Sequence, residues 1–324
     1  MLGLEEIIEN FQPRADSPLA EKLKAATAFG GVPPLAGKIQ NGIFVYLPEI
    51  SDFKKQEIFF HDEINNEEEE IHQLDSLRNH YYHQYFKKWL YQLPSNSTIL
   101  EIGAAAGYDL IPILKKGYNV VACDISLASI KALKAKIENS YPQFKDQVAY
   151  LVADGQNLPF GQESFAAVFL VATLHHFENQ NNLLAQIKKI TKKGGLIILA
   201  MEPSRLMMRF TKLFKNAKSL RLFNSSSAAD ETHAGYCLRD WSQIVNRESR
   251  YANGDLRIAK IKRVWLLQGF IHYGLEAIFR LFKLKKRLKL PRFLEWFFLI
   301  LDEILLKIPL LNRLNWHWVI IIQN

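Results

Sequence analysis

The sequence predicts an α/β protein with a doubly wound sheet, mostly parallel but with an antiparallel last strand, and a helical cap inserted before that strand. Short apolar runs alternate with helical patterns through the middle of the chain, which is typical of a parallel sheet covered by helices. A β-branched run at residues 316–322 predicts a final strand. The pattern divides the chain into an N-terminal extension, a sheet core, a basic helical cap and a terminal core strand, at residues 1–95, 96–203, 204–312 and 313–324.

The N-terminal extension is predicted to hold a small β element followed by helices. Ile43–Pro48 reads as a short strand that ends at the proline. Glu67–Glu70 is interpreted as the solvated start of a helix rather than as a binding run. Apolar residues at helical spacing before Pro94 then predict a helix that packs against the core, and these are Tyr81, Tyr82, Tyr85, Phe86 and Leu90.

The core begins with a strand, a glycine turn and a helix. Ile99–Ile102 predicts a short buried strand, and Gly103 and Gly107 allow the backbone to turn sharply after it. The next strand, Asn119–Ala122, leads to Asp124. A carboxylate beside a glycine turn, at the carboxyl edge of a parallel sheet, is typical of a site that holds a nucleotide ribose.

Three further strands are predicted to end at the same edge. They lie at residues 148–152, 165–171 and 196–201, and a helix near 181–191 precedes the last of them. Ser126 can cap the helix that follows Asp124. Asp154 follows the third strand of the core, and His175 and His176 follow the fourth. Since parallel strands bring their carboxyl ends together, these side chains should lie near the glycine turn.

The cysteine content and the N-terminal sequence indicate the cellular compartment of the protein. Two cysteines in 324 residues, Cys123 and Cys237, are too few for a disulfide framework or a thiolate zinc site, so no metal is expected. The acidic start of the chain, with Glu5 and Glu6, lacks the basic and apolar segments of a secretory signal. We therefore expect a cytoplasmic protein.

Positive charge is concentrated in one region. The chain carries a net +8, yet residues 205–292 hold 20 Lys or Arg against six Asp or Glu. Such a segment faces an acidic substrate, an anionic membrane surface or nucleic acid. Residues 293–311 are apolar but interrupted by charges that share one helical sector, which predicts an amphipathic helix rather than a membrane span. We expect this region to cap the acceptor site and to touch an anionic membrane peripherally; the alternative is that its aromatic face packs against the sheet.

The motif Glu101-x-Gly103-x-x-x-Gly107 followed by Asp124 resembles the first two motifs of the class I S-adenosylmethionine-dependent methyltransferases, in particular the small-molecule branch. Later motifs agree with this resemblance. They are Asp154-Gly155-Gln156-Asn157-Leu158-Pro159-Phe160, Leu174-His175-His176-Phe177 and Lys193-Gly194-Gly195. The resemblance covers about residues 96–203 and the terminal strand. It departs at Ala105, where the family has a glycine but tolerates small residues.

The resemblance implies a Rossmann-like fold and S-adenosyl-L-methionine as the cofactor. It assigns Glu101, Gly103 and Gly107 to the methionine end of the cofactor, Asp124 to the ribose hydroxyls and Asp154 to the adenine. The remaining cofactor contacts that it implies are Ala105, Ile125, Gly155 and Val171. The competing interpretations are a sheet turn without a ligand and the dinucleotide-binding domain of a dehydrogenase. A dehydrogenase fingerprint spaces glycines as Gly-x-Gly-x-x-Gly, which Ala105 and Ala106 do not supply.

His175 and His176 are the candidate catalytic residues, because they follow the fourth strand at the edge where the methyl group should lie. The alternative is that one packs in the core and the other bonds to backbone. Glu202, after the fifth strand, faces the same edge. The segment Asp230–Tyr236 is a candidate lid over the acceptor.

The function implied is methyl transfer to a small or lipid-like acceptor. One alternative is an RNA methyltransferase, which the basic segment favours, although no RNA-binding module or base-methylation motif is recognisable. Another is a noncatalytic cofactor-binding partner protein. The stretch Asn41–Glu49 also resembles the closing strand of a small zinc-ribbon module, without the cysteines that would bind zinc.

Overall fold

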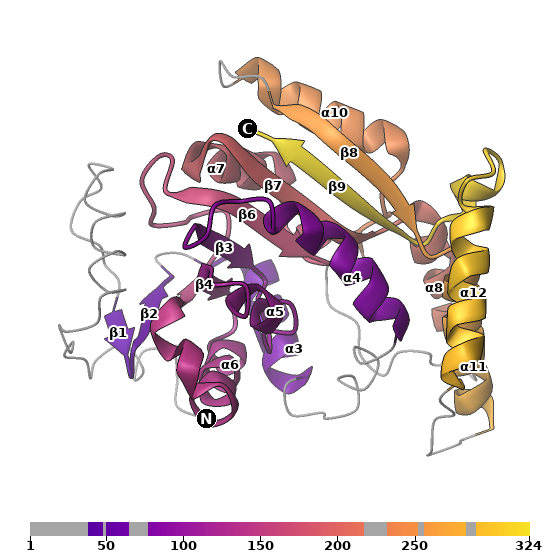
Figure 1. The fold of residues 1–324 in the computed structure, drawn as a ribbon, viewed down its shortest axis with the longest axis horizontal. Coiled ribbons are helices and arrows are strands. Elements are labelled where there is room, and N and C mark those ends of the chain that lie inside the picture. Colours follow the sequence, from indigo (N-terminus) through magenta and orange to yellow (C-terminus); the bar gives the residue numbers. More distant parts are fainter. Residues whose placement is uncertain (1–37, 48–49, 65–76, 217–231, 252–255, 283–289) are drawn as a thin grey trace.

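The computed structural model describes residues 38–47, 50–64, 77–216, 232–251, 256–282 and 290–324. Within these residues, one nine-stranded sheet has the order β1-β2-β5-β4-β3-β6-β7-β9-β8 (Figure 1). Its strands are β1 (Lys38–Gln40), β2 (Ile43–Tyr46), β3 (Thr98–Ile102), β4 (Asn119–Asp124), β5 (Val148–Ala153), β6 (Phe165–Val171), β7 (Thr191–Pro203), β8 (Arg257–Val264) and β9 (His317–Gln323).

The sheet is parallel from β2 to β7, and β9 runs antiparallel between β7 and β8. This confirms the predicted mostly parallel sheet with an antiparallel last strand. One element was not foreseen, because residues 257–264 of the predicted helical cap form strand β8. This strand pairs with β9, so Ile258 lies opposite Ile322 and Val264 opposite His317. The basic segment therefore contributes to the sheet as well as to the helical layer.

The helices are α3 (Asp52–Ile64), α4 (Leu77–Leu90), α5 (Leu110–Leu114), α6 (Leu127–Ser140), α7 (Gln180–Ile190), α8 (Arg205–Asn216), α10 (Leu238–Tyr251), α11 (Leu267–Leu281) and α12 (Arg292–Leu305). Short 3-10 turns are η2 (Pro142–Gln147), η3 (Leu174–His176) and η4 (Leu311–Leu314). Ser126 caps α6, as expected, by accepting a hydrogen bond from the N–H of Ser129. In the parts that the structure describes, no helix is both long and apolar enough to cross a bilayer.

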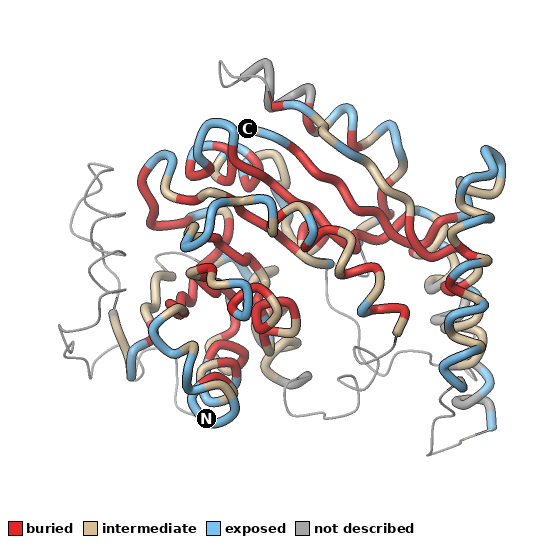
Figure 2. Tube along the Cα trace, viewed as in Figure 1, coloured by how far each residue is buried: buried red, intermediate tan, exposed pale blue. Residues whose placement is uncertain are grey.

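Both faces of the sheet are buried, which explains why its central strands read as continuous apolar runs (Figure 2). On one face, the strands pack with Phe86 of α4 and Ile130 of α6. On the other, they pack with Leu184 of α7 and Trp241 of α10. The aromatic helix predicted before Pro94 is α4, and its Tyr82, Phe86 and Leu90 are buried.

The described part of the N-terminal extension belongs to the same sheet. The turn Asn41–Gly42 has positive φ at both residues, as a tight hairpin requires, and it joins β1 to β2. Strand β2 then pairs in parallel with β5, with Ile43 opposite Tyr150. These strands form an edge of the core sheet, and nothing found supports a zinc-ribbon module there. The acidic run Glu67–Glu70 lies outside the described residues.

Candidate functional site

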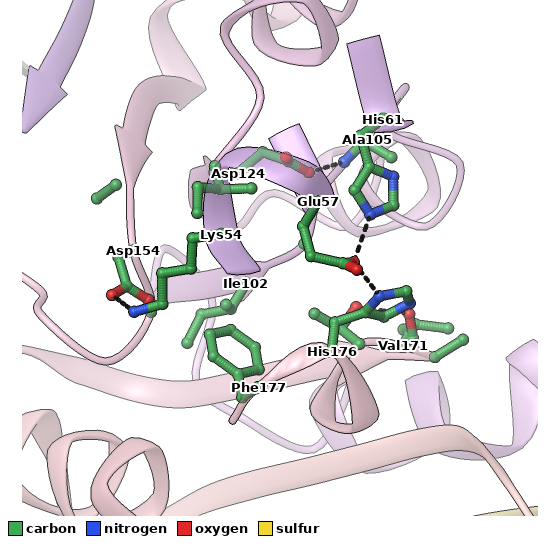
Figure 3. A pocket seen from close by; sticks show the side chains of 16 residues that line it. Lys54, Glu57, His61, Ile102, Ala105, Asp124, Asp154, Val171, His176 and Phe177 are labelled. Carbon is green, nitrogen blue, oxygen red and sulfur yellow. Dashed lines mark hydrogen bonds and ion pairs between the residues drawn. The ribbon is translucent and has the colours of Figure 1, made fainter. Parts of the chain in front are cut away.

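A pocket opens at the carboxyl ends of strands β3 to β6, where the sequence predicted the site (Figure 3). Its cavity volume is about 180 Å³. Its walls come from the glycine turn, from the turns after β4, β5 and β6, and from helix α3. The pocket-lining residues that the sequence predicted are Gly103, Ala105, Asp124, Ile125, Asp154, Gly155, Val171 and His176.

The glycine turn brings backbone to the floor of the pocket. Gly103 has a φ of +78°, and a Cβ placed there would lie 2.4 Å from Thr173 Oγ1. Gly107 has a φ of +69°, and a Cβ there would lie 2.3 Å from Leu133 Cδ1. Gly103 therefore requires glycine for conformation and for space, while Gly107 requires it chiefly for conformation, because the end of the Leu133 side chain can move. Ala105 also has a positive φ, of 42°, so the residue that replaces the family glycine keeps the left-handed backbone of the turn.

Asp124 is held at the pocket wall by the turn that it faces. Its Oδ2 accepts a hydrogen bond of 2.9 Å from the N–H of Ala105, and its Oδ1 accepts one of 2.9 Å from the N–H of Ser126. The carboxylate is buried, so these bonds fix its position with little freedom. Its remaining lone pairs are the acceptors that two vicinal hydroxyls would use.

Asp154 lies on the same wall, after β5, but its carboxylate is engaged in the structure. Oδ1 accepts from the N–H of Gln156, while Oδ2 forms an ion pair with Lys54 Nζ. Lys54 comes from α3, outside the predicted cofactor-binding half. An adenine amine that reached Asp154 would share or displace this lysine.

Glu101 lies on β3, two residues before Gly103, and is not among the residues that line the pocket. Its carboxyl is buried, and Oε2 has no hydrogen-bond partner among the described residues. Burial, and then the nearby charge of Asp109, raises the pKa of Glu101 well above its usual value. A buried acceptor without a donor is costly. An ammonium group that reached Glu101 would supply that donor, which is the contact that the resemblance to the methyltransferases assigns to the methionine end of S-adenosylmethionine.

The two candidate catalytic histidines have different surroundings. His175 is buried, and its Nδ1 lies 2.9 Å from Oε2 of Glu202. Glu202 also accepts hydrogen bonds from the N–H groups of Thr173 and Leu174. Burial alone would raise the pKa of Glu202, but these bonds, led by that to His175, lower it. Glu202 therefore holds the turn after β6 in place, and His175 is part of that support rather than of the pocket wall.

His176 lines the pocket and meets two side chains from α3 (Figure 3). Its Nδ1 lies 2.7 Å from Glu57 Oε2, and His61 Nε2 lies 3.8 Å from the same oxygen. Glu57 is buried. These donor atoms lie within 4.8 Å of one another, so this set could also hold a metal ion. The expectation of no metal considered cysteines alone, and elemental analysis of purified protein would test it.

No motif in the sequence assigned Lys54, Glu57 or His61 to the site. Their spacing of three and four residues places them on one face of α3, where all three line the pocket. Helical spacing of charged and imidazole side chains was visible in the sequence. What it could not show is that this helix lies across the carboxyl edge of the sheet. His233, from the candidate lid, packs near His175 with ring centroids 6.1 Å apart, while Asp230 and Glu231 lie outside the described residues.

Comparison with known proteins agrees with this geometry. Residues 100–199 match the family described as Methyltransferase domain. Curated relatives include a tRNA (carboxymethyluridine(34)-5-O)-methyltransferase of Arabidopsis thaliana, 28% identical over 45% of this chain and 37% of that protein. They also include a demethylmenaquinone methyltransferase of Renibacterium salmoninarum, 28% identical over 52% of this chain and 59% of that protein. The alignments thus span less than two thirds of these relatives.

Solved structures share the fold. One is a protein assigned as a sarcosine dimethylglycine methyltransferase from Galdieria sulphuraria, with a TM-score of 0.53 and 12% identity over 84% of this chain and 98% of that chain. Another is phosphoethanolamine N-methyltransferase 2 of Haemonchus contortus in complex with S-adenosyl-L-methionine, with a TM-score of 0.50 and 16% identity over 85% of this chain and 60% of that chain. Residues 100–199 are therefore a methyltransferase domain with the class I fold, and its cofactor is S-adenosylmethionine.

Proposed function

We propose that this protein transfers a methyl group from S-adenosylmethionine to a small or lipid-like acceptor. The observation that carries the proposal is that one pocket joins the predicted cofactor contacts to an imidazole–carboxylate pair, His176 and Glu57. Asp124 and Asp154 mark the adenosine end. The cofactor supplies an electrophilic methyl carbon, so the protein needs chiefly to position the acceptor and to leave its nucleophilic atom unprotonated.

His176 is the proposed base. Its Nδ1 faces the buried carboxylate of Glu57, which orients the ring and would stabilise the imidazolium. In that orientation Nε2 is the nitrogen that can take a proton from an acceptor hydroxyl or amine. His175 is a positioning residue in this scheme, because it acts through Glu202 on the backbone of the turn that carries His176.

Two observations favour an apolar acceptor. The pocket walls include the apolar side chains of Ile102, Ile125, Val171 and Phe177. Several curated relatives, among them one from Paenarthrobacter aurescens, are demethylmenaquinone methyltransferases, which by name act on demethylmenaquinone. The few cysteines favour a cytoplasmic setting for this activity.

RNA methylation is the second candidate. The Arabidopsis thaliana relative is a tRNA methyltransferase, and the net charge of residues 205–292 suits a polyanion. Chemistry at the pocket would be the same, but the acceptor would be a base or a ribose.

The test is incubation with methyl-labelled cofactor and separate lipid, small-metabolite and RNA extracts. We expect label in the lipid or small-metabolite fraction, and a loss of about 100-fold or more in rate for His176→Ala. His80→Ala, which removes an exposed histidine of α4, is the matched control. Affinity for S-adenosylhomocysteine should change less than about threefold in His176→Ala. Label in RNA alone would support the second candidate, and tight cofactor binding without turnover on any fraction would indicate a noncatalytic protein.

A further inference from the structure

Helix α12 presents its apolar side to solvent. Phe293 is 70% exposed, Trp296 48% and Phe297 57%. Ile300 and Ile304 continue the same stripe and are more than half exposed. On a helical wheel these five residues share a sector roughly 100° wide. An amphipathic helix of a globular protein normally turns such a sector toward the core, and here the arrangement is reversed.

The charged side of α12 faces the protein instead. Asp302 is fully buried and accepts a hydrogen bond of 2.5 Å from Tyr82 Oη of α4. Its carboxylate also accepts from the backbone N–H groups of Leu266 and Leu267, at the start of α11. Glu303 forms an ion pair of 2.7 Å with Lys262 of β8. These polar contacts fix the rotation of α12, so the outward position of its aromatic side is built into the fold.

The exposed apolar surface extends beyond α12. Phe270, Ile278 and Phe282, on and just after α11, are exposed large hydrophobic residues, as are Ile308 and Leu310 after α12. The two helices stand together at one end of the molecule (Figure 1), and the outer turns of α12 are exposed (Figure 2). A monomeric protein seldom leaves so many large apolar residues exposed in one region without a partner for them.

Charge identifies the kind of partner. Residues 283–291, between α11 and α12, carry five Lys or Arg and no acidic residue. In the described residues, Arg292 and Lys307 are exposed at the two ends of α12. Aromatic and aliphatic residues flanked by cations are the composition that binds the interface of an anionic membrane.

We propose that the exposed side of α11 and α12 docks this protein on an anionic lipid bilayer, with Phe293, Trp296 and Phe297 inserted at the level of the head groups. Docking goes beyond methyl transfer and does not depend on it. If the acceptor is lipid-like, docking also explains how the enzyme meets a substrate that resides in a membrane. The alternative in which this aromatic face packs against the sheet is excluded by its exposure.

The test is co-sedimentation of the full chain with vesicles. Phosphatidylcholine vesicles are compared with vesicles that contain phosphatidylglycerol, at low and at high salt. We expect binding to the anionic vesicles at low salt, with at least about tenfold weaker partitioning at high salt. Trp296→Ser combined with Phe297→Ser should weaken binding about tenfold or more. Phe59→Ser, which removes an equally exposed phenylalanine (59%) from α3, should leave binding unchanged.

Two results would overturn the proposal. One is no binding of the native chain to anionic vesicles at low salt. The other is a concentration-dependent dimer, without vesicles, that the Trp296 and Phe297 substitutions dissociate, since a second copy of the chain would then cover the surface. Circular dichroism of each variant confirms that it is folded, and unchanged S-adenosylhomocysteine affinity separates loss of docking from damage to the cofactor site.

Discussion

Replacing Asp124 with alanine tests the assignment of the cofactor site most directly. The Asp124 carboxylate is buried, and the N–H groups of Ala105 and Ser126 hold it in place at 2.9 Å each. A bound ribose would therefore meet acceptors that are already ordered. Losing charge-assisted hydrogen bonds to the ribose hydroxyls should cost on the order of 2 kcal/mol, or roughly thirtyfold in Kd.

The same substitution also affects folding, because it leaves two backbone N–H groups without their acceptor. Each such group costs about 1–3 kcal/mol when it is buried and unpaired. Asp124→Asn keeps one acceptor oxygen and should be less destabilised. Calorimetric titration with S-adenosylhomocysteine measures the change in Kd, at a temperature where circular dichroism shows that both variants are folded. Asp146→Ala, at an exposed position, is the control. An Asp124→Ala protein that is folded and binds within twofold of the native chain would refute the reasoning.

Three further outcomes are expected. Gly103→Ala should lower cofactor affinity and thermal stability, because its Cβ would lie 2.4 Å from Thr173 Oγ1 at a φ of +78°; Gly194→Ala, where a Cβ meets nothing within 4 Å, is the comparison for backbone strain alone. Burial, then the charge of Arg78, lowers the pKa of His317 to about 3. Between about pH 6.5 and 3 the folded protein thus binds fewer protons than the unfolded chain. The free energy of unfolding therefore keeps its full value above pH 6.5 and declines below it, by about 2 kcal/mol at pH 5. Thermal melts at pH 7 and 5 should show that decline, and less of it in His317→Gln. Asp302→Ala should lower the free energy of unfolding by about 2–4 kcal/mol in urea titrations, because it strands buried donors.

Much of the core could be predicted because its determinants are local. Alternating apolar runs and helical patterns locate the strands and helices, and Gly103 and Gly107 locate the turn through a backbone conformation that only glycine adopts readily. The strand pattern alone then gathers Asp124, Asp154 and His176 at one place, because parallel strands share a carboxyl edge. All three line the pocket.

The part of the site that comes from α3 could not be predicted in the same way. Glu57 meets His176 across 119 residues of sequence, and Lys54 meets Asp154 across 100. Nothing local to α3 specifies that it lies over the sheet edge. Strand β8 was missed for a related reason, since its Lys and Arg residues at 257–264 matched the basic helical segment around it. Its pairing with β9 is a tertiary contact that provides hydrogen-bond partners for the backbone of residues 257–264, and such a contact can outweigh the local preference for a helix.

The orientation of α12 could not be predicted from the sequence. Apolar periodicity defines two sides of a helix, but it does not say which side faces the protein, and the usual assumption is that the apolar side does. Here a buried carboxylate, Asp302, accepts hydrogen bonds from Tyr82 and from the start of α11, and this fixes the rotation. A buried carboxylate would be costly without those donors. The rotation of α12 that gives Asp302 its hydrogen bonds is also the rotation that leaves Phe297 exposed. It follows that Asp302→Ala, which removes the acceptor for these hydrogen bonds and so releases the rotation of α12, should weaken vesicle binding even though residue 302 itself never meets the lipid.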